Sequence, residues 1–261
     1  MTTPTYHGLP CWYELGTTDI PAASEFYHSV LDWSIADSGM EGVSYHLANA
    51  PDGVGVAGMM DTAGQEGAPP PNWLIYFGCA DCDATAAAVT AAGGTIIVPP
   101  SDIPGTGRFS VCFDPQGAAF GILQPAPMEA PPQGSAFDQS APGHGNWHEL
   151  MSSDPEAGFA FYADLFGWTK GETMPMGEMG NYQLFQHGGT DIGGMMGLGN
   201  SPVSAWLPYF GTPGVQEAIG RIQAGGGAIQ HGPTDVPGGA YIAVATDPQN
   251  AFFAVVGPKN A

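Results

Sequence analysis

The chain contains the same residue pattern twice, and this duplication limits the folds that it can adopt. Trp12 and Glu14 recur at one constant spacing as Trp147 and Glu149. The same spacing relates Leu15, Asp19, Ala22, Phe26, Tyr27 and Trp33 to Leu150, Asp154, Ala157, Phe161, Tyr162 and Trp168. An internal repeat of this length predicts two similar structural modules in one chain of 261 residues. We assign residues 1–124 to the first module, 125–145 to a proline-rich linker and 146–261 to the second module.

Charge and hydropathy exclude several classes of partner. Lys and Arg total 4 against 25 Asp and Glu, so the formal net charge is −21. Such an acidic surface repels phosphate backbones and anionic lipids, and we therefore expect no nucleic-acid or membrane partner. No apolar run approaches the roughly 18 residues of a membrane helix, and the first residues lack the features of a signal peptide. We expect a cytoplasmic protein.

The four cysteines all lie in the first module, so the two copies share no disulfide framework. This distribution fits a reducing compartment. Cys79 and Cys82 form a Cys-x-x-Cys motif, which is half of a zinc or redox motif, but no second pair accompanies it. A structural or incidental role is the expectation for these two residues.

Local patterns predict the same order of elements in both copies. The elements expected in the first are a strand over 11–17, a helix from Asp19 to Asp32, a hairpin over 43–60, a strand over 73–77, a helix over 81–92 and a last strand around Phe120. In the second copy, Ser153 and Glu156 match a capping box at the start of the helix. Each copy is therefore expected to be α+β.

Several of these motifs together resemble a known family. A first strand leads into a helix that contains Phe26 and Tyr27, and the turn Asp114-Pro115-Gln116-Gly117 precedes the last strand. This order resembles the vicinal oxygen chelate superfamily of glyoxalases, bleomycin-resistance proteins and extradiol dioxygenases. Trp-x-Glu-Leu and 107–109 resemble tandem glyoxalase-like proteins that are labelled hydroxylases or secreted mycobacterial antigens.

The resemblance implies tandem βαβββ modules whose curved mixed sheets form cups for a small ligand. It also implies positions for a divalent metal ion, a His or Gln in the first strand and a Glu in the last. Here the corresponding residues are Trp12 and Gly121 in the first copy and Trp147 and Ala254 in the second. None offers the N, O or S donor that a metal requires, and we expect no metal site of the usual kind. An atypical site built from His148, His187 and Glu149 stays open.

Strand geometry suggests what the cups offer in place of a metal. Side chains alternate between the faces of a strand, so Trp12 shares a face with Glu14, and Trp147 with Glu149. An indole beside a carboxylate suits a flat apolar ligand with a hydrogen-bond donor or positive charge. Apolar surroundings would raise the pKa of either glutamate and allow it to act as a general base. The alternative is that both tryptophans fill the core and both glutamates pair with nearby donors.

Further candidates for ligand contacts differ between the copies. Tyr45 and Tyr182 occupy second strands, and Met174 and Met176 precede the strand of Tyr182. The methionines suit either an adaptable ligand wall or a core gap. Arg108 would hold a ligand anion or neutralise Glu14. His148 should face away from the cup as a core residue.

Two functions follow from these residues. The preferred one is a metal-independent protein that binds a small aromatic or amphipathic molecule in one or both cups. The alternative is an enzyme of the superfamily, a lyase, hydroxylase or dioxygenase, that uses Glu14 or Glu149 as base or recruits a metal through an atypical site. A monomer and a homodimer are both compatible with the sequence.

Overall fold

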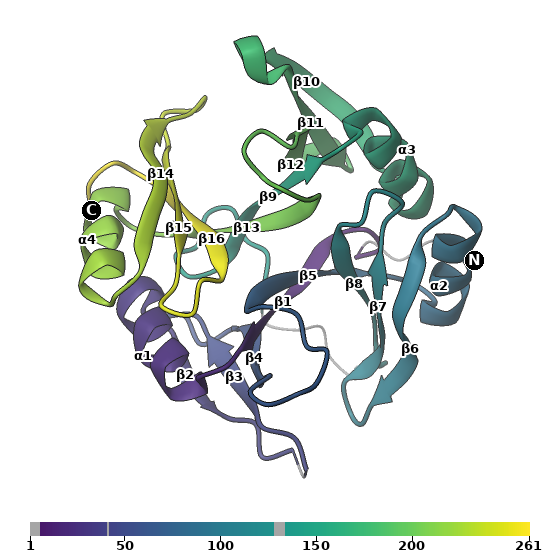
Figure 1. The fold of residues 1–261 in the computed structure, drawn as a ribbon, viewed down its shortest axis with the longest axis horizontal. Coiled ribbons are helices and arrows are strands. Elements are labelled where there is room, and N and C mark those ends of the chain that lie inside the picture. Colours follow the sequence, from purple (N-terminus) through teal and green to yellow (C-terminus); the bar gives the residue numbers. More distant parts are fainter. Residues whose placement is uncertain (1–5, 41, 128–133) are drawn as a thin grey trace. The chain divides into compact units, whose positions relative to one another are not determined.

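The fold is built from two eight-stranded mixed sheets, one for each repeat (Figure 1). The computed structural model describes residues 6–40, 42–127 and 134–261. Strand order is β2-β3-β4-β1-β5-β8-β7-β6 in the first sheet and β10-β11-β12-β9-β13-β16-β15-β14 in the second. The two orders are equivalent, which confirms the predicted duplication and the α+β class.

The element bounds show that each module contains the βαβββ pattern twice. The first module comprises β1 (Pro10–Thr17), α1 (Ile20–Leu31), β2 (Ser34–Asp37), β3 (Tyr45–Asn49), β4 (Gly55–Asp61), β5 (Asn72–Gly78), α2 (Cys82–Ala91), β6 (Thr95–Ile103), β7 (Gly107–Phe113) and β8 (Ala119–Pro125). The second comprises β9 (Gly145–Ser152), α3 (Pro155–Phe166), β10 (Thr169–Pro175), the short 3-10 helix η1 (Gly177–Met179), β11 (Asn181–His187), β12 (Thr190–Gly197), β13 (Ala205–Gly211), α4 (Val215–Ala224), β14 (Ala228–Asp235), β15 (Tyr241–Thr246) and β16 (Phe252–Gly257). In each βαβββ unit the first strand runs parallel to the last, as in the pairs β1–β4 and β5–β8.

The predicted elements are present, and the strands that sequence patterns did not reveal are peripheral. The edge strand β2 is mostly exposed, and β6, at the other edge of the sheet, contains Pro99 and Pro100. Edge strands tolerate proline and need no apolar period, because one side lacks a hydrogen-bonded neighbour. The edge strands β10 and β14 of the second sheet were likewise absent from the expectation.

The helix starts show which residues cap the helices, and they correct the predicted capping box. Asp19 caps α1, where its Oδ1 accepts a hydrogen bond from the Ala22 amide at 3.0 Å. In α3 the cap is Asp154, whose Oδ1 accepts from the Ala157 amide at 3.1 Å, so the expected Ser153 cap is wrong. A carboxylate also interacts favourably with the positive end of the helix dipole.

The contacts of the chain group into two compact units, each of which takes one βαβββ pattern from each repeat. One unit comprises Met1–Cys11, Ile75–Pro132 and Trp147–Trp206. The other comprises Trp12–Leu74, Gln133–Asn146 and Leu207–Ala261. We call them the 75/147 unit and the 12/207 unit. Each has its own aromatic core.

A buried hydrogen-bond chain lies at the centre of the 75/147 unit. The Trp206 indole donates to the Tyr162 hydroxyl at 2.9 Å, and this hydroxyl donates to Asp114 Oδ2 at 3.1 Å. Asp114 Oδ1 accepts from the amides of Gln116 and Ala118 at 2.9 and 2.8 Å. Burial raises the pKa of Asp114, and these hydrogen bonds oppose the rise. The Asp-Pro-Gln turn is thus an internal anchor for α3.

The 12/207 unit contains the same chain. Trp73 donates to the Tyr27 hydroxyl at 2.9 Å, and Tyr27 donates to Asp247 Oδ2 at 3.1 Å. Part of the expected linker also belongs to this unit. Trp33 donates to the Gly143 carbonyl at 2.7 Å, and His144 Nε2 lies 3.1 Å from Asp52 Oδ2. Residues 128–133 of that linker lie outside the described residues.

Candidate functional site

The first candidate site is a hydrogen-bond chain on β1 and β3 in the 12/207 unit. The Trp12 indole donates to the Tyr45 hydroxyl at 3.0 Å, and that hydroxyl donates to Glu14 Oε2 at 3.1 Å. Trp12 and Glu14 are two residues apart on β1 and are both half-buried, whereas Tyr13 between them is fully buried. This alternation confirms that Trp12 and Glu14 share a face. We call these three residues the first Trp-Tyr-Glu cluster.

The second Trp-Tyr-Glu cluster lies on β9 and β11 in the 75/147 unit. The Trp147 indole donates to the Tyr182 hydroxyl at 2.9 Å, and Tyr182 is hydrogen-bonded to Glu149. Trp147 and Glu149 are again half-buried, and Tyr182 is buried. The two clusters therefore have the same residues and the same direction of hydrogen bonding.

A glycine makes room for the tyrosine in each cluster. A Cβ added at Gly58 on β4 would lie 1.8 Å from the Tyr45 hydroxyl oxygen. A Cβ added at Gly194 on β12 would lie 2.1 Å from the Tyr182 ring. Both glycines pair in register with the cluster glutamate on the neighbouring parallel strand. The repeated Gly-Met-Met sequence thus has a structural role at the site, which the sequence analysis did not assign.

The tyrosine of each cluster is held in its neutral form. Burial raises the pKa of Tyr45, and the negative charge of Glu14 raises it further. Burial and Glu149 act in the same way on the pKa of Tyr182. Each phenol therefore stays protonated and donates a hydrogen bond to the carboxylate. A half-buried indole and carboxylate remain as the chemical groups of the site.

The structure bears on both interpretations of these residues. The glutamates do have a nearby donor, the tyrosine hydroxyl. The tryptophans differ from the core tryptophans Trp33 and Trp168, which are 0% and 3% exposed. Trp12 and Trp147 are only half-buried and are held by their N–H groups, an arrangement compatible with contact between the indole ring and a ligand.

The residues at the family's metal positions do not fit a metal ion. The indole nitrogens of Trp12 and Trp147 are N–H donors engaged with tyrosine. The space beside Gly121 is filled by the Tyr76 ring, which a Cβ at this glycine would meet at 2.2 Å. Ala254 is fully buried and pairs with Tyr209. Within residues 6–40, 42–127 and 134–261, no three His, Cys, Asp or Glu side chains are grouped so that they could hold a metal.

The histidines of the atypical metal site have other partners. His148 is fully buried, as expected for a core residue, and its Nδ1 lies 2.8 Å from the Ile192 carbonyl oxygen. Because a carbonyl only accepts, Nδ1 carries the hydrogen. Burial lowers the pKa of His148 to about 4. His187 Nε2 lies 2.8 Å from the His7 carbonyl oxygen.

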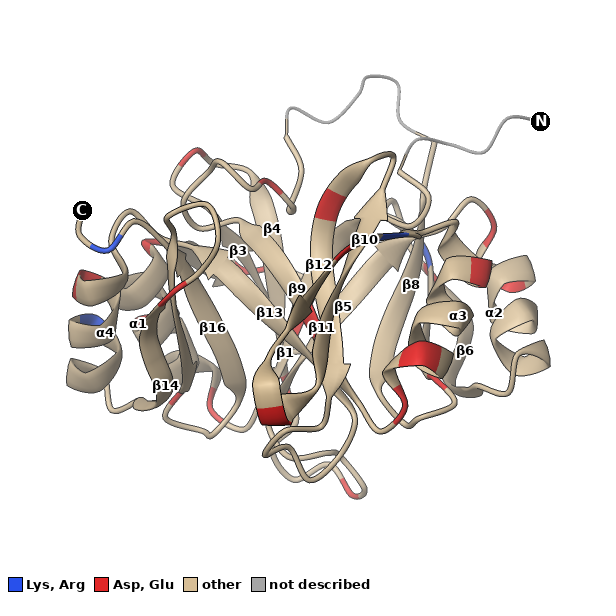
Figure 2. Ribbon diagram, turned by 90° about the horizontal axis from the view of Figure 1, so that it is seen from above, with Lys and Arg blue, Asp and Glu red and all other residues tan. Residues whose placement is uncertain are grey.

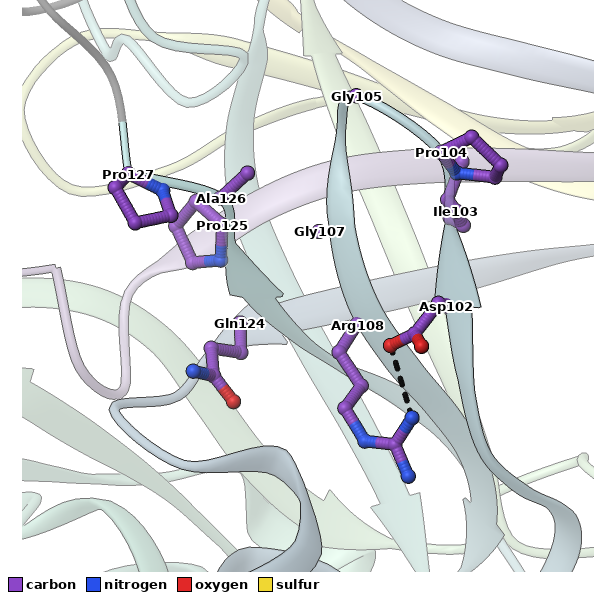
Figure 3. A pocket seen from close by; sticks show the side chains of 10 residues that line it. All are labelled: Asp102, Ile103, Pro104, Gly105, Gly107, Arg108, Gln124, Pro125, Ala126 and Pro127. Carbon is purple, nitrogen blue, oxygen red and sulfur yellow. Dashed lines mark hydrogen bonds and ion pairs between the residues drawn. The ribbon is translucent and has the colours of Figure 1, made fainter.

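Arg108 is engaged by carboxylates other than the expected Glu14. Its Nε and Nη2 donate to the two oxygens of Asp83 at 2.7 and 2.9 Å, and its Nη1 donates to Asp102 at 2.9 Å. Figure 3 shows Arg108 and Asp102 on neighbouring strands at the wall of a pocket of about 360 Å³. The pocket is lined mainly by glycine and proline residues of the β6–β7 turn and the end of β8.

The two candidate methionines have different positions. Met174 pairs with Tyr182 across β10 and β11, so their side chains lie on one face of the sheet. Met174 is half-buried, whereas Met176 is 40% exposed beside η1. Met174 is thus the methionine associated with the second cluster.

Few basic side chains balance the acidic surface. Figure 2 shows Asp and Glu spread over helices and loops, with Lys and Arg at a few points only. Apart from Arg108, Lys170 pairs with Glu156, Arg221 donates to the Val30 carbonyl, and Lys259 lies over the Tyr241 ring. These are the four basic residues of the sequence, and each is engaged outside the two clusters. No helix within the described ranges has the length and apolar character needed to span a membrane.

Comparisons with known proteins agree with this architecture. Residues 11–122 match the model of the Glyoxalase/Bleomycin resistance protein/Dioxygenase superfamily. The chain is 33% identical over 260 residues to CFP32 of Mycobacterium tuberculosis, whose name presents it as a candidate glyoxylase, with 96% of this chain and 95% of that protein covered. It is 29% identical to the anthracycline biosynthesis protein DauV of Streptomyces sp. strain C5, covering 97% and 94%. The Mn(II)-bound glyoxalase of Novosphingobium aromaticivorans has a similar fold, with a TM-score of 0.67, 16% identity and coverage of 100% and 84%.

Proposed function

Because this chain belongs to the glyoxalase/bleomycin resistance/dioxygenase superfamily, we propose that it binds a small flat aromatic molecule at its Trp-Tyr-Glu clusters, without the metal ion of its metal-dependent relatives. The observation that carries the proposal is the hydrogen-bond chain from indole to phenol to carboxylate, which occurs once in each repeat. In both copies it replaces a metal-ligand position with a half-buried aromatic ring.

The chemistry of the cluster defines the ligand. Trp147 offers a ring for stacking, and its N–H is already used by Tyr182. Glu149 is an acceptor when ionised, so it favours a ligand N–H, O–H or ammonium group. Met174 beside Tyr182 adds an adaptable apolar surface, which makes the second cluster the preferred site.

The charge of the molecule favours cationic over anionic ligands. A formal charge of −21 attracts cations at long range, and all four basic side chains are engaged elsewhere. A carboxylate or sulfonate on the ligand would find no basic side chain within either cluster. The name of the Streptomyces relative links it to anthracyclines, and a planar polycycle is the kind of ligand described here.

Three probes with one ring system test this proposal. We would titrate the protein with anthraquinones that carry an ammonium, a neutral or a sulfonate side chain, and follow tryptophan fluorescence and heat. The expected order of affinity is ammonium above neutral, with no measurable binding of the sulfonate. Absence of binding by all three rings would refute the proposal.

Paired substitutions locate the site. Glu149→Gln should weaken ammonium binding about tenfold, as expected for loss of one charge-assisted hydrogen bond, and leave neutral binding unchanged. Trp147→Leu should abolish binding of both rings at the second cluster. Glu14→Gln and Trp12→Leu are the matched variants of the first cluster. Unchanged affinities in all four variants would return these residues to a purely structural role.

An enzyme is the second candidate, and one observation favours it: the relative with 33% identity is named as a candidate glyoxylase. In this case Glu14 or Glu149 would act as general base, beside a tyrosine that donates a hydrogen bond to it. Turnover of a 2-oxoaldehyde with a thiol, lost in Glu149→Gln or Glu14→Gln while ring binding persists, would support it.

A further inference from the structure

A second chemical site lies at the start of α2, away from the Trp-Tyr-Glu clusters. Cys79 follows the end of β5, and Cys82 is the first residue of α2. Both are free thiols and fully buried, and their side chains are hydrogen-bonded to each other. The backbone N–H of each is fixed to β8, where Cys79 donates to the Leu123 carbonyl and Cys82 to Gln124 Oε1, both at 2.9 Å.

The pocket of Figure 3 is connected to the start of α2 by two of the residues that line it. Two of its lining residues, Arg108 and Gln124, contact the first turn of α2 directly. Gln124 accepts the hydrogen bond from the Cys82 amide, and Arg108 holds Asp83, the next residue. The backbone of Cys82 is therefore bonded to the polar wall of this pocket, whose volume of about 360 Å³ is large enough for a molecule the size of water or peroxide.

We propose that Cys79 and Cys82 form a redox-active dithiol, in which Cys82 reacts with a peroxide from the pocket side and Cys79 closes the disulfide. The two side chains interact with each other, and a Cys-x-x-Cys motif at a helix start keeps its thiols close together in the chain.

The two thiols have different roles because one stabilises the other. The hydrogen bond with Cys82, together with burial, raises the pKa of Cys79. The same bond lowers the pKa of Cys82. Burial and the negative charge of Asp83 oppose this effect, and the positive charge of Arg108 adds to it, so that the pKa of Cys82 is lowered on balance. We assign Cys82 as the attacking thiol, because its backbone is hydrogen-bonded to the pocket residue Gln124 and its pKa is lowered, and Cys79 as the resolving thiol.

In the overall reaction, two electrons and two protons pass from the two thiols to hydrogen peroxide, which becomes two water molecules. The Cys82 thiolate attacks one oxygen of hydrogen peroxide, the O–O bond breaks, and the departing hydroxide takes a proton to give water and a Cys82 sulfenic acid. The Cys79 sulfur then attacks the Cys82 sulfur, so that the S–S bond forms and the S–O bond breaks. The released hydroxide takes the Cys79 proton as a second water. A dithiol reductant reverses the closure.

The other two cysteines serve as internal controls. Burial raises the pKa of Cys11 to about 12, and the Cys11 thiol donates to the Tyr76 carbonyl at 3.4 Å. Burial also raises the pKa of Cys112 to about 11. Because the pKa of both thiols is raised, whereas that of Cys82 is lowered, both are less often in the reactive thiolate form and should react slowly with peroxide.

Mass spectrometry of the full chain tests the proposal without any substitution. After mild peroxide treatment and alkylation, we expect a peptide with a Cys79–Cys82 disulfide, while Cys11 and Cys112 are alkylated, and full recovery of four alkylated cysteines after dithiothreitol. Four alkylated cysteines after peroxide at all concentrations that leave the protein folded would overturn it, as would a disulfide between other pairs.

Single substitutions test the assigned order of reaction. Cys79→Ser should leave a sulfenic acid on Cys82 that dimedone traps, and Cys82→Ser should leave Cys79 unmodified. Cys112→Ser is the control and should still form the disulfide. Sulfenic acid on Cys79 in the Cys82→Ser variant would contradict the assignment of Cys82 as nucleophile.

Discussion

At the scale of single residues, each Trp-Tyr-Glu cluster depends on a glycine. Gly194 lies under the Tyr182 ring, and Gly58 occupies the same place under Tyr45. Neither glycine has an unusual backbone conformation, so its role is the space that it leaves. Sequence patterns predicted which strands carry these residues, but the close approach of ring and backbone requires strand pairing.

Gly194→Ala should therefore displace Tyr182 and break its bond to Trp147. We expect a loss of about 1–3 kcal/mol in the free energy of unfolding, the usual cost of overpacking, together with loss of ligand binding at the second cluster. Gly197→Ala is a matched control on the same strand, because a Cβ there would meet no atom within 4 Å. Urea titration of both variants measures the difference, and equal stabilities would contradict the assigned role of Gly194.

His148 makes stability depend on pH. Its folded pKa is about 4, below its ordinary value, so the folded protein resists protonation of this side chain. The part of the free energy of unfolding that depends on neutral His148 is fully present above the unfolded pKa, roughly 6.5. It is lost as the pH falls toward 4, which lowers the free energy of unfolding by about 3 kcal/mol.

The pH effect is measured as a difference between two proteins. Urea unfolding at pH 7 and at pH 4.5 should show a steeper loss of stability for the wild type than for His148→Gln, which keeps a neutral donor for the Ile192 carbonyl. Other titrating groups cancel in this comparison. Parallel pH profiles would exclude His148 as the source.

At the scale of elements, the helices are joined to distant turns by buried tyrosines. Tyr162 of α3 connects Trp206 on β13 with Asp114 in the turn before β8. Its sequence neighbours predicted a buried helix face, but not the partners of its hydroxyl. Likewise, the exposed edge strand β2 and the proline-containing β6 lacked the apolar period that revealed the central strands.

Tyr162→Phe should destabilise the fold by about 2–4 kcal/mol, because it leaves the Trp206 N–H and an Asp114 oxygen buried without this partner. Tyr27→Phe should have the same effect through Trp73 and Asp247. Tyr241→Phe is the control, since it keeps the ring that Lys259 covers. Chemical denaturation would measure the stability of all three variants. A Tyr162→Phe variant as stable as Tyr241→Phe would show that the Trp206–Tyr162–Asp114 hydrogen bonds contribute little to the free energy of unfolding.

At the scale of the whole molecule, a net charge of −21 opposes the compact state. Salt screens this repulsion, so the melting temperature should rise between about 0.05 and about 1 M NaCl, over which the Debye length falls to roughly 3 Å. The substitutions Glu25→Gln, Glu66→Gln and Asp164→Asn at exposed positions should raise the melting temperature at low salt and reduce this response. Calorimetry of the triple variant is the test, and a response equal to that of the wild type would refute self-repulsion as its cause.

The sequence by itself determined the duplication and the central strands and helices. It also determined that Trp12, Gly121, Trp147 and Ala254, at the positions where the family resemblance implies metal ligands, carry no metal-binding side chain. These properties depend on residue identity and short-range periodicity, which can be read along the chain. Only the tertiary structure decided that a tyrosine joins each tryptophan to its glutamate, that Arg108 binds Asp83 and Asp102, and that each compact unit combines one βαβββ pattern from each repeat. Each of these depends on residues far apart in sequence, whose meeting is set by strand pairing and packing.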